Sequence, residues 1–284
     1  MSQRVRDKAV ATATIAIQLA TWVDGEFVLP KPKIPDWQSV PPEEAALGLR
    51  QNWDVGMDPL PNMVHLLESR GVRVFSLVEE CRDLDGLSLW HDSTPYVFLN
   101  TTKPAARSRF SAAHELGHLL LHRAFGPSGH RTTEAEANRF ASAFLMPRDN
   151  IIDSVPKDST LKELEHHART WNVSVQALIY RMHEIGMTTR WRYRSLFIGY
   201  NRRPLDDSGP GETSKVYRQV FDLLRAQGRD RSDVADAIHL HLEDLHALVF
   251  GLVPTILPDD PSPSQVPYDS IPETVTGTGP QLVP

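Results

Sequence analysis

The sequence predicts a mainly helical α+β protein with a small three-stranded sheet, followed by a C-terminal helical bundle and a disordered tail. Three observations support this prediction. Most long segments repeat their apolar residues at the helical period. Only residues 72–78, 87–91 and 96–100 combine β-branched or aromatic side chains with turn residues between the runs, which is typical of short strands. From residue 254 onward Pro, Ser and Thr dominate, and little apolar surface remains to form a core.

The composition is that of an ordinary globular protein and excludes several classes. A chain of 284 residues, of which 40% are hydrophobic and 23% charged, is long enough for one sizeable core plus an accessory region. The net charge of −6 disfavours a surface built mainly for nucleic acid. Cys81 is the only cysteine, so a disulfide framework and a cysteine-based zinc cluster are both excluded.

The start of the chain is expected to be helical, with an extended connector behind the first helix. Residues 9–20 superficially resemble a signal peptide, but polar residues interrupt the run and no small-x-small cleavage site follows, which favours an amphipathic helix ending near Gly25. The prolines of residues 29–35 predict an extended connector. A second helix is expected from Pro41 to about Trp53. No segment has membrane-spanning length, so the protein is expected to be cytoplasmic.

The middle of the chain predicts a short helix at residues 62–70, then the three strands, then longer helices. Pro104 suits the first turn of a long helix that is expected to end near Arg123. Thr133 can cap the next helix, whose apolar residues repeat at helical spacing until Pro147. The further helices are expected at residues 161–171, 175–185, 214–227, 233–238 and 243–250.

Changes in composition divide the chain into four regions. The character of the sequence changes after residue 187, where arginine begins to alternate with aromatic residues, and the last region is the Pro-, Ser- and Thr-rich tail. The regions are an N-terminal helical region with a proline-rich connector (1–60), a domain with the strands and the long helix (61–187), a C-terminal helical region (188–253) and a disordered tail (254–284).

The long helix carries the pattern His-Glu-x-x-His, formed by His114, Glu115 and His118. Residues four apart lie on one face of a helix, so both imidazoles can reach a single Zn²⁺. Glu115 lies about 100° round the helix, where its carboxylate can act on a water at the metal without binding the metal itself. The alternative is an ordinary buried helix whose histidines are satisfied by hydrogen bonds.

A catalytic zinc site needs a third protein ligand and a fourth position for water. His122 is excluded as that ligand, because it lies about 12 Å along the helix axis from His114, whereas the ligands of one metal must converge. His122 is therefore expected to contact a ligand or to pack beside the site. The candidates for the third ligand are Glu134 and Glu136, on the following helix.

Glu134 and Glu136 lie about 160° apart round a helix, so only one of them can face the metal. Glu136 stands three residues after Thr133, which is the spacing of a capping box and gives Glu136 a structural role at the helix start. Glu134 is followed one turn later by Asn138, whose amide can hydrogen-bond to the carboxylate and orient it. These arguments favour Glu134 as the third ligand, with Glu136 as the alternative.

Three segments in order along the chain resemble the ImmA/IrrE family of metallopeptidases. They are residues 109–122 with the His-Glu-x-x-His pattern, residues 134–147, which begin Glu-Ala-Glu-Ala-Asn, and residues 172–186. The resemblance covers roughly residues 62–187 and is far more specific than the zinc pattern alone. It implies a zincin-like fold of the gluzincin class, in which Zn²⁺ is the cofactor and a glutamate on the helix after the two histidines is the third ligand.

The resemblance also implies a function. Members of the family act on DNA-binding repressors, in mobile-element control or in stress responses. Longer members carry an N-terminal helix-turn-helix domain, and this sequence begins without an evident one, which suggests a separately encoded regulator as partner. We therefore expect a zinc-dependent endopeptidase that cleaves a helix-turn-helix transcriptional repressor.

Two features leave alternatives open for catalysis. Tyr180, Arg181 and His183 could donate to the transition-state oxyanion, but a buried tyrosine or a salt-bridged arginine is the plainer interpretation, and the role is left unassigned. Residues 96–100 could pair with substrate backbone if this strand lies at the sheet edge beside the site. The alternative is an interior strand with both edges already used.

The main rival class is a DNA-binding or interaction regulator on a peptidase-like fold without proteolysis. Residues 228–246 have helix-turn-helix spacing, yet the second helix offers Glu243, Asp244 and His246 rather than side chains that read bases or meet phosphates. Residues 190–194 alternate arginine with aromatic residues and could touch phosphates, although a solvated helix face or a protein contact fits better. Direct nucleic-acid binding and membrane binding are therefore not expected.

Overall fold

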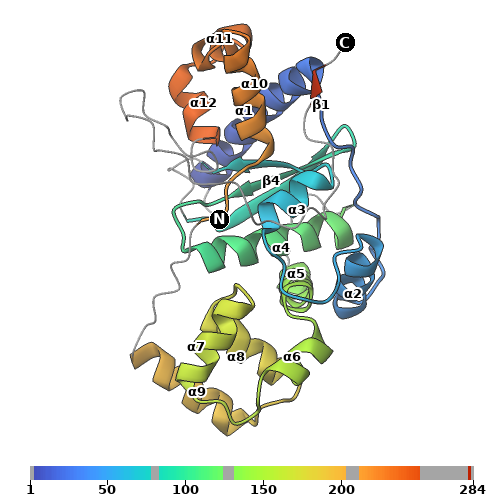
Figure 1. Ribbon diagram of the computed structural model, residues 1–284, viewed down its shortest axis with the longest axis vertical. Coiled ribbons are helices and arrows are strands. Elements are labelled where there is room, and N and C mark those ends of the chain that lie inside the picture. The colour runs from blue at the N-terminus through green and yellow to red at the C-terminus, as the bar shows by residue number, and fades with distance from the viewer. Residues whose placement is uncertain (1–2, 78–82, 124–130, 203–210, 250–280, 283–284) are drawn as a thin grey trace.

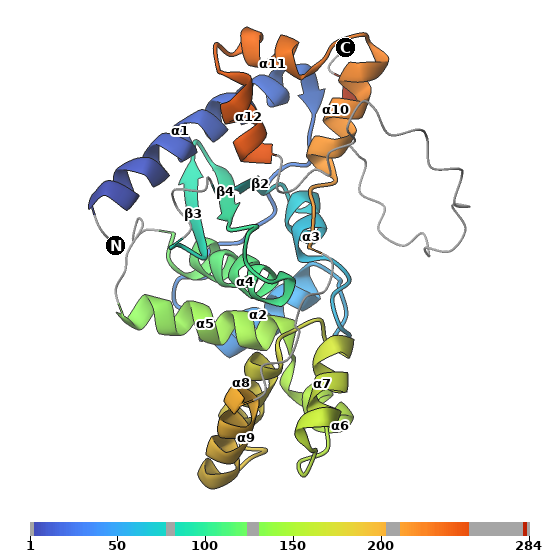
Figure 2. The same ribbon diagram turned by 90° about the vertical axis from the view of Figure 1, so that its left-hand side faces the viewer.

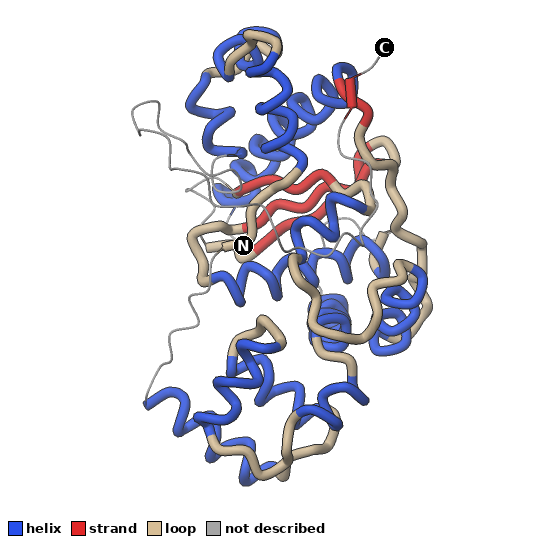
Figure 3. Tube along the Cα trace, in the orientation of Figure 1, coloured by secondary structure: helices blue, strands red, loops and turns tan. Residues whose placement is uncertain are grey.

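A three-stranded sheet lies at the centre of the molecule, with helices on both of its faces (Figures 1 and 3). This computed structural model describes residues 3–77, 83–123, 131–202, 211–249 and 281–282. The strands of the central sheet are β2 (Arg73–Ser76), β3 (Gly86–His91) and β4 (Thr94–Leu99). The mainly helical α+β class predicted from the sequence is confirmed.

Most of the described chain is helical. The first helices are α1 (Gln3–Glu26), α2 (Pro42–Asn52), α3 (Met63–Ser69), α4 (Ala105–Leu121) and α5 (Arg131–Leu145). The later helices are α6 (Arg148–Ser154), α7 (Leu161–Thr170), α8 (Val175–Glu184), α9 (Arg190–Arg202), α10 (Val216–Ala226), α11 (Arg231–Ala237) and α12 (Leu242–Val249). The sequence does not predict α6, because Pro147 marks the end of one helix there but is also the N-cap of the next.

β4 is the central strand of the sheet. It pairs in parallel with β2, where Val74 lies opposite Val97, and antiparallel with β3, where Ser88 lies opposite Val97. Both edges of β4 are therefore used, and the alternative in which residues 96–100 form the sheet edge is wrong. Among the described strands β3 pairs only with β4, so β3 is the edge strand beside α4.

The side chains of β4 alternate between two hydrophobic cores. Val97 and Leu99 pack with helices from α2 to α9 on one face, whereas Tyr96 and Phe98 pack with α1 and α10–α12 on the other. Although α1 and α10–α12 come from distant parts of the sequence, they lie together over the sheet (Figure 2). The sheet is thus buried on both faces.

The division into regions 1–60, 61–187 and 188–253 stays a prediction.

The predicted disordered tail, residues 254–284, lies outside the described residues except for Gln281 and Leu282. These form β5 (Gln281–Leu282), which pairs antiparallel with β1 (Phe27–Val28). Among the helices of the described segments, none has the length and apolar character needed to cross a membrane.

Two buried arginines fix the C-terminal end of α5. The guanidinium of Arg50, in α2, donates to the carbonyl oxygens of Phe144 and Asp58, and that of Arg181, in α8, donates to the carbonyl oxygen of Met146 at 2.9 Å. Burial lowers the pKa of Arg50 to about 10, so its guanidinium remains charged near neutral pH. The carbonyl groups at a helix end lack partners within the helix. The arginines supply partners in this region and tie α2 and α8 to α5.

We expect Arg181→Met to lower the free energy of unfolding by about 3 kcal/mol, measured by urea denaturation. Arg181 is fully buried and also pairs with Glu43 at 2.6 Å and Glu184 at 3.1 Å, so the substitution leaves several polar groups without their partner. The matched control is Arg169→Met, because Arg169 is 75% exposed and lies 4.0 Å from Glu165. Its effect should stay below about 0.5 kcal/mol. Equal losses in both variants would contradict a special role for Arg181.

Candidate metal centre

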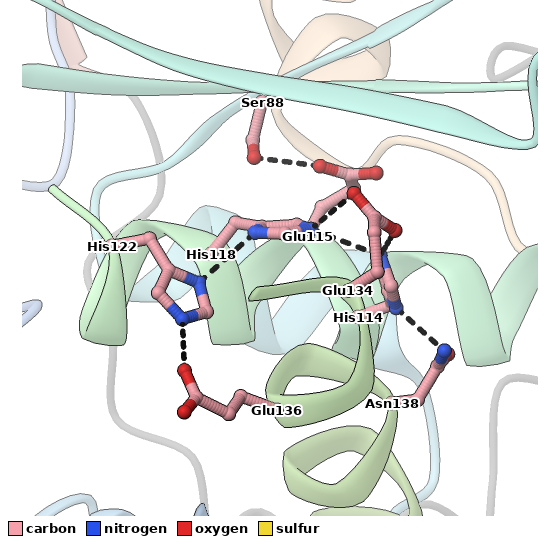
Figure 4. Close-up of polar contacts among 8 residues, drawn as sticks. All are labelled: Ser88, His114, Glu115, His118, His122, Glu134, Glu136 and Asn138. Atoms are coloured by element: carbon pink, nitrogen blue, oxygen red, sulfur yellow. Dashed lines mark hydrogen bonds and ion pairs between the residues drawn. The ribbon is translucent and has the colours of Figure 1, made fainter. Parts of the chain in front are cut away.

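Helix α4 lies between the sheet and α5 and presents both histidines of the His-Glu-x-x-His pattern toward α5 (Figure 4). Its opposite face carries Ala112, Leu116 and Leu119, which are buried in the core and set the rotation of the helix. The Nε2 atoms of His114 and His118 lie 3.0 Å apart. The helical spacing therefore brings the two imidazoles together, as the sequence predicts.

Helix α5 supplies a third side chain beside the two imidazoles. The carboxylate of Glu134 has one oxygen 3.3 Å from Nε2 of His114 and the other 3.5 Å from Nε2 of His118. Within the described part of the chain, these three residues are the only group of His, Cys, Asp and Glu side chains arranged so that they could hold a metal ion.

The candidate ligand groups approach one another to about the spacing that a zinc ion requires. A tetrahedral ion with bonds of about 2.0–2.1 Å separates its ligand atoms by roughly 3.3–3.4 Å. Here the two Nε2 atoms are 3.0 Å apart, and the two carboxylate oxygens of Glu134 lie 3.3 Å from Nε2 of His114 and 3.5 Å from Nε2 of His118, one oxygen facing each imidazole. Two imidazole nitrogens and a carboxylate oxygen are also ligands that Zn²⁺ prefers, and three protein ligands leave a fourth position open. The residues therefore fit a catalytic zinc ion.

Close packing of α4 on α5 brings Glu134 within reach of the histidines. Gly117 lies where the two helices meet. A side-chain carbon at this position would lie 3.0 Å from Cδ1 of Phe140 and 3.3 Å from Cα of Ala137. Because glycine inside a helix costs roughly 1 kcal/mol relative to alanine, its presence here is best explained by the close approach of the two helices.

Burial favours the neutral form of both histidines. It lowers the pKa of His118 to about 3, and the neighbouring His114 and His122 add to this shift. Burial also lowers the pKa of His114, against the opposing effect of Glu134. A neutral imidazole keeps the lone pair that a metal ion needs. Both side chains are thus in the protonation state of a metal ligand near neutral pH.

Glu115 lies beside the three candidate ligands, beneath the edge strand β3 (Figure 4). The hydroxyl of Ser88 donates to Oε2 of Glu115 at 2.6 Å. Burial raises the pKa of Glu115 to about 7; the bond from Ser88 opposes this shift, and the charge of Glu134 adds to it. A carboxyl group with a pKa near the working pH can both accept and return a proton.

Strand β3 contributes residues that the sequence analysis did not single out. Gly86, Ser88 and Trp90 face α4, while the leucines between them pack into the core on the other face of the sheet. The indole of Trp90 donates to the carbonyl oxygen of Leu119 at 3.2 Å. A side-chain carbon on Gly86 would lie 2.9 Å from Oε1 of Glu115. The signal in the sequence was the alternation of small residues with leucines.

Asn138 and His122 contact the two histidines directly. The sequence predicts that Asn138 orients Glu134, but its Oδ1 lies 3.0 Å from Nδ1 of His114 instead. That prediction is wrong because α5 packs so closely on α4 that the amide reaches the neighbouring helix. Nδ1 of His122 lies 3.0 Å from Nδ1 of His118, so His122 contacts a candidate ligand without being one.

Glu136, the alternative third ligand, lies on another side of α5. Its carboxylate is 2.8 Å from Nε2 of His122 and is not part of the group that could hold the metal. The sequence also predicts a capping box with Thr133 before the helix, but α5 already begins at Arg131, so Thr133 is inside the helix. Glu136 therefore joins α5 to α4 rather than serving only the start of its own helix.

The residues considered as oxyanion donors have other surroundings. Arg181 is salt-bridged, as the plainer interpretation expects, whereas Tyr180 is 47% exposed, so a buried tyrosine was the wrong expectation. Nδ1 of His183 lies 3.3 Å from the carbonyl oxygen of Thr188. The arginine and aromatic residues from position 190 lie on α9, where Trp191 is 77% exposed. The oxyanion donor stays unassigned.

The comparison with known proteins agrees with the geometry of the site. A peptidase family model described as the IrrE N-terminal-like domain matches residues 67–183. No curated protein matches the chain. The matched span contains β2 to β4, α4 and α5, and therefore every residue of the site described above. The resemblance to the ImmA/IrrE metallopeptidases is thus confirmed over residues 67–183, which are similar to the IrrE N-terminal-like domain.

Proposed function

We propose that this protein is a zinc-dependent endopeptidase that cleaves a regulatory protein in the control of mobile elements or stress responses. The observation that carries the proposal is the convergence of His114, His118 and Glu134 beside the buried carboxyl group of Glu115. The peptidase family model that matches residues 67–183 supports a protein substrate. The substrate that we propose is a helix-turn-helix repressor encoded separately, and the place of cleavage is the cytoplasm, where such a repressor binds DNA.

The side chains divide the chemistry between binding and proton transfer. His114, His118 and Glu134 would hold the ion. A bound Zn²⁺ would supply a water of lowered pKa and would polarise the scissile carbonyl group. Glu115 accepts the proton of the attacking water and returns it to the nitrogen of the leaving amine. Ser88 holds Oε2 of Glu115 and so keeps the carboxylate in one orientation during both transfers.

The edge strand β3 is the element that we propose to align the substrate. β3 pairs with β4 on one side, and Ser88 of β3 reaches Glu115. An extended peptide can add to an open strand edge through backbone hydrogen bonds, with little dependence on its sequence. A peptide bound along β3 would run past Glu115 and the three candidate ligands. This role replaces the one considered for residues 96–100, which form the central strand.

The first test is Glu115→Gln. The variant should keep the fold and stoichiometric zinc, because the three proposed ligands are unchanged. Its rate of peptide cleavage should fall by about 10²–10⁴-fold, because an amide cannot shuttle the proton. Glu44→Gln is the control, since Glu44 is exposed on α2. Cleavage by Glu115→Gln at the rate of Glu44→Gln would show that Glu115 is not the base.

The second test concerns the third ligand. Glu134→Ala should lose both zinc, measured by metal analysis after dialysis, and cleavage, because two histidines hold the ion far less well than three ligands. Glu44→Ala should retain both. If Glu134→Ala kept stoichiometric zinc while Glu136→Ala lost it, Glu136 would be the ligand instead.

The third test concerns the substrate. Purified helix-turn-helix repressors incubated with the zinc-loaded protein should be cut at a defined bond, seen by mass spectrometry of the fragments, and Glu115→Gln should leave them intact. Removing zinc with a chelator should stop cleavage, and adding zinc back should restore it. Tight binding of this chain to operator DNA without proteolysis of any regulator would contradict the proposal and favour the non-enzymatic class.

A further inference from the structure

A row of polar side chains extends from the proposed metal site along α4 and α5 (Figure 4). Nδ1 of His118 lies 3.0 Å from Nδ1 of His122, and Nε2 of His122 lies 2.8 Å from Oε2 of Glu136. His122 is the C-cap residue of α4 and is 6% exposed, whereas the side chain of Glu136 is 42% exposed. Both ring nitrogens of a buried histidine are thus satisfied, and the row ends at a carboxylate that water can reach.

The carboxylate end of the row determines where the protons lie. A carboxylate can only accept, so Nε2 of His122 carries a hydrogen and donates it to Glu136. An uncharged imidazole that donates from Nε2 can only accept at Nδ1, and a contact of 3.0 Å between two nitrogens needs one hydrogen between them. That hydrogen belongs to Nδ1 of His118. Nε2 of His118 therefore keeps its lone pair, 3.0 Å from Nε2 of His114 and 3.5 Å from a carboxylate oxygen of Glu134.

We propose that His122 and Glu136 are positioning residues that hold His118 in the tautomer and ring orientation needed to bind the metal through Nε2, a role that rests on the proposed metal site. Neither residue belongs to the group of side chains that could hold the metal. Outer partners of this kind fix the ring of a ligating histidine and increase its basicity, and their loss typically weakens metal binding by about 10–100-fold.

The two metal-binding histidines are held in different ways. Nδ1 of His114 lies 3.0 Å from Oδ1 of Asn138, a neutral acceptor that contacts it directly. Glu136 lies about 160° round α5 from Glu134, too far round the helix to face His118 in the same way. His122, one turn beyond His118 on α4, spans this distance and connects His118 to a charged acceptor. Removing Glu136 should therefore affect His118 and leave His114 unchanged.

The tautomer of each histidine in the zinc-free protein gives the first test. Long-range ¹H–¹⁵N correlation spectra should show His118 protonated at Nδ1 and His122 at Nε2 in the wild-type protein. In Glu136→Ala, His118 should populate both tautomers, while His114 keeps the tautomer set by Asn138. A merely structural contact would not produce this selective change. Protonation of His118 at Nε2 in the wild type, or an unchanged tautomer of His118 in Glu136→Ala, would overturn the proposal.

Zinc affinity, measured by competition with a chromophoric chelator, gives the second test. Glu136→Ala should bind one zinc ion about 10–100-fold more weakly than the wild type. Glu136→Gln removes the same charge but keeps an oxygen that can accept from His122, so its affinity should stay closer to that of the wild type. Arg139→Ala, on an exposed position of α5, is the control and should bind zinc normally. Wild-type zinc affinity in Glu136→Ala, or equal losses of affinity in the Ala and Gln variants, would overturn the positioning role of Glu136.

His122→Phe tests the middle of the row, because phenylalanine keeps an aromatic ring but offers no nitrogen to His118. It should weaken zinc binding at least as much as Glu136→Ala, with one ion still bound. If this buried substitution unfolds the protein, the half-exposed Glu136 variants still decide the question. If the wild-type protein bound no zinc, the proposed function would be refuted. The positioning role of His122 and Glu136 would still be decided separately, by the tautomers in the zinc-free protein.

Discussion

The close packing of α4 against α5 is the constraint on which the rest of the structure depends. Three ligand atoms from two helices must lie within about 3.5 Å of one another for a single zinc ion to bind them. Gly117 allows the helices to approach, and the contacts of Arg50 and Arg181 with the C-terminal end of α5 fix the direction of that helix. The apolar core beneath α4 fixes the rotation that aims His114 and His118 at α5. Buried interactions far from the candidate metal site thus set the geometry of its side chains.

The helices that cover both faces of the sheet also serve the candidate metal site, because they hold the sheet in place. β3 has to lie firmly beside α4 for Ser88 to reach Glu115, and a three-stranded sheet with one bare apolar face would not hold this position. Helices α1 and α10–α12 bury the second face. A further contact ties this layer to the site, because Glu212, just before α10, pairs with Arg109 on α4 and accepts from the backbone N–H of Met63 at 2.8 Å. The C-terminal helices therefore support the helix that carries the histidines.

Contacts that depend on local periodicity could be predicted from the sequence, and contacts between elements could not. The spacing of His114 and His118 fixes a shared face on any helix, and the fold class follows from the periods of the apolar residues. The partner of Asn138 and the role of Glu136 depend on how closely two helices pack, which no spacing within α5 reveals. The contribution of Ser88 depends on strand order, since the same alternation occurs on an interior or an edge strand. The α4–α5 contact, rather than either helix alone, determines these roles.

Burial is what gives two carboxylates of one site different tasks. The side chain of Glu134 is 46% exposed, and its carboxylate lies next to two imidazoles, where it could help to hold a cation. Glu115 is buried under β3, and the loss of solvent raises its pKa to about 7. Such a carboxyl group can give up and regain a proton near neutral pH with little change in free energy. A general base that later returns its proton as an acid needs this property. A more exposed Glu115 would lose the raised pKa. The position of each helix face relative to the sheet therefore determines which glutamate could bind a metal ion and which could transfer a proton.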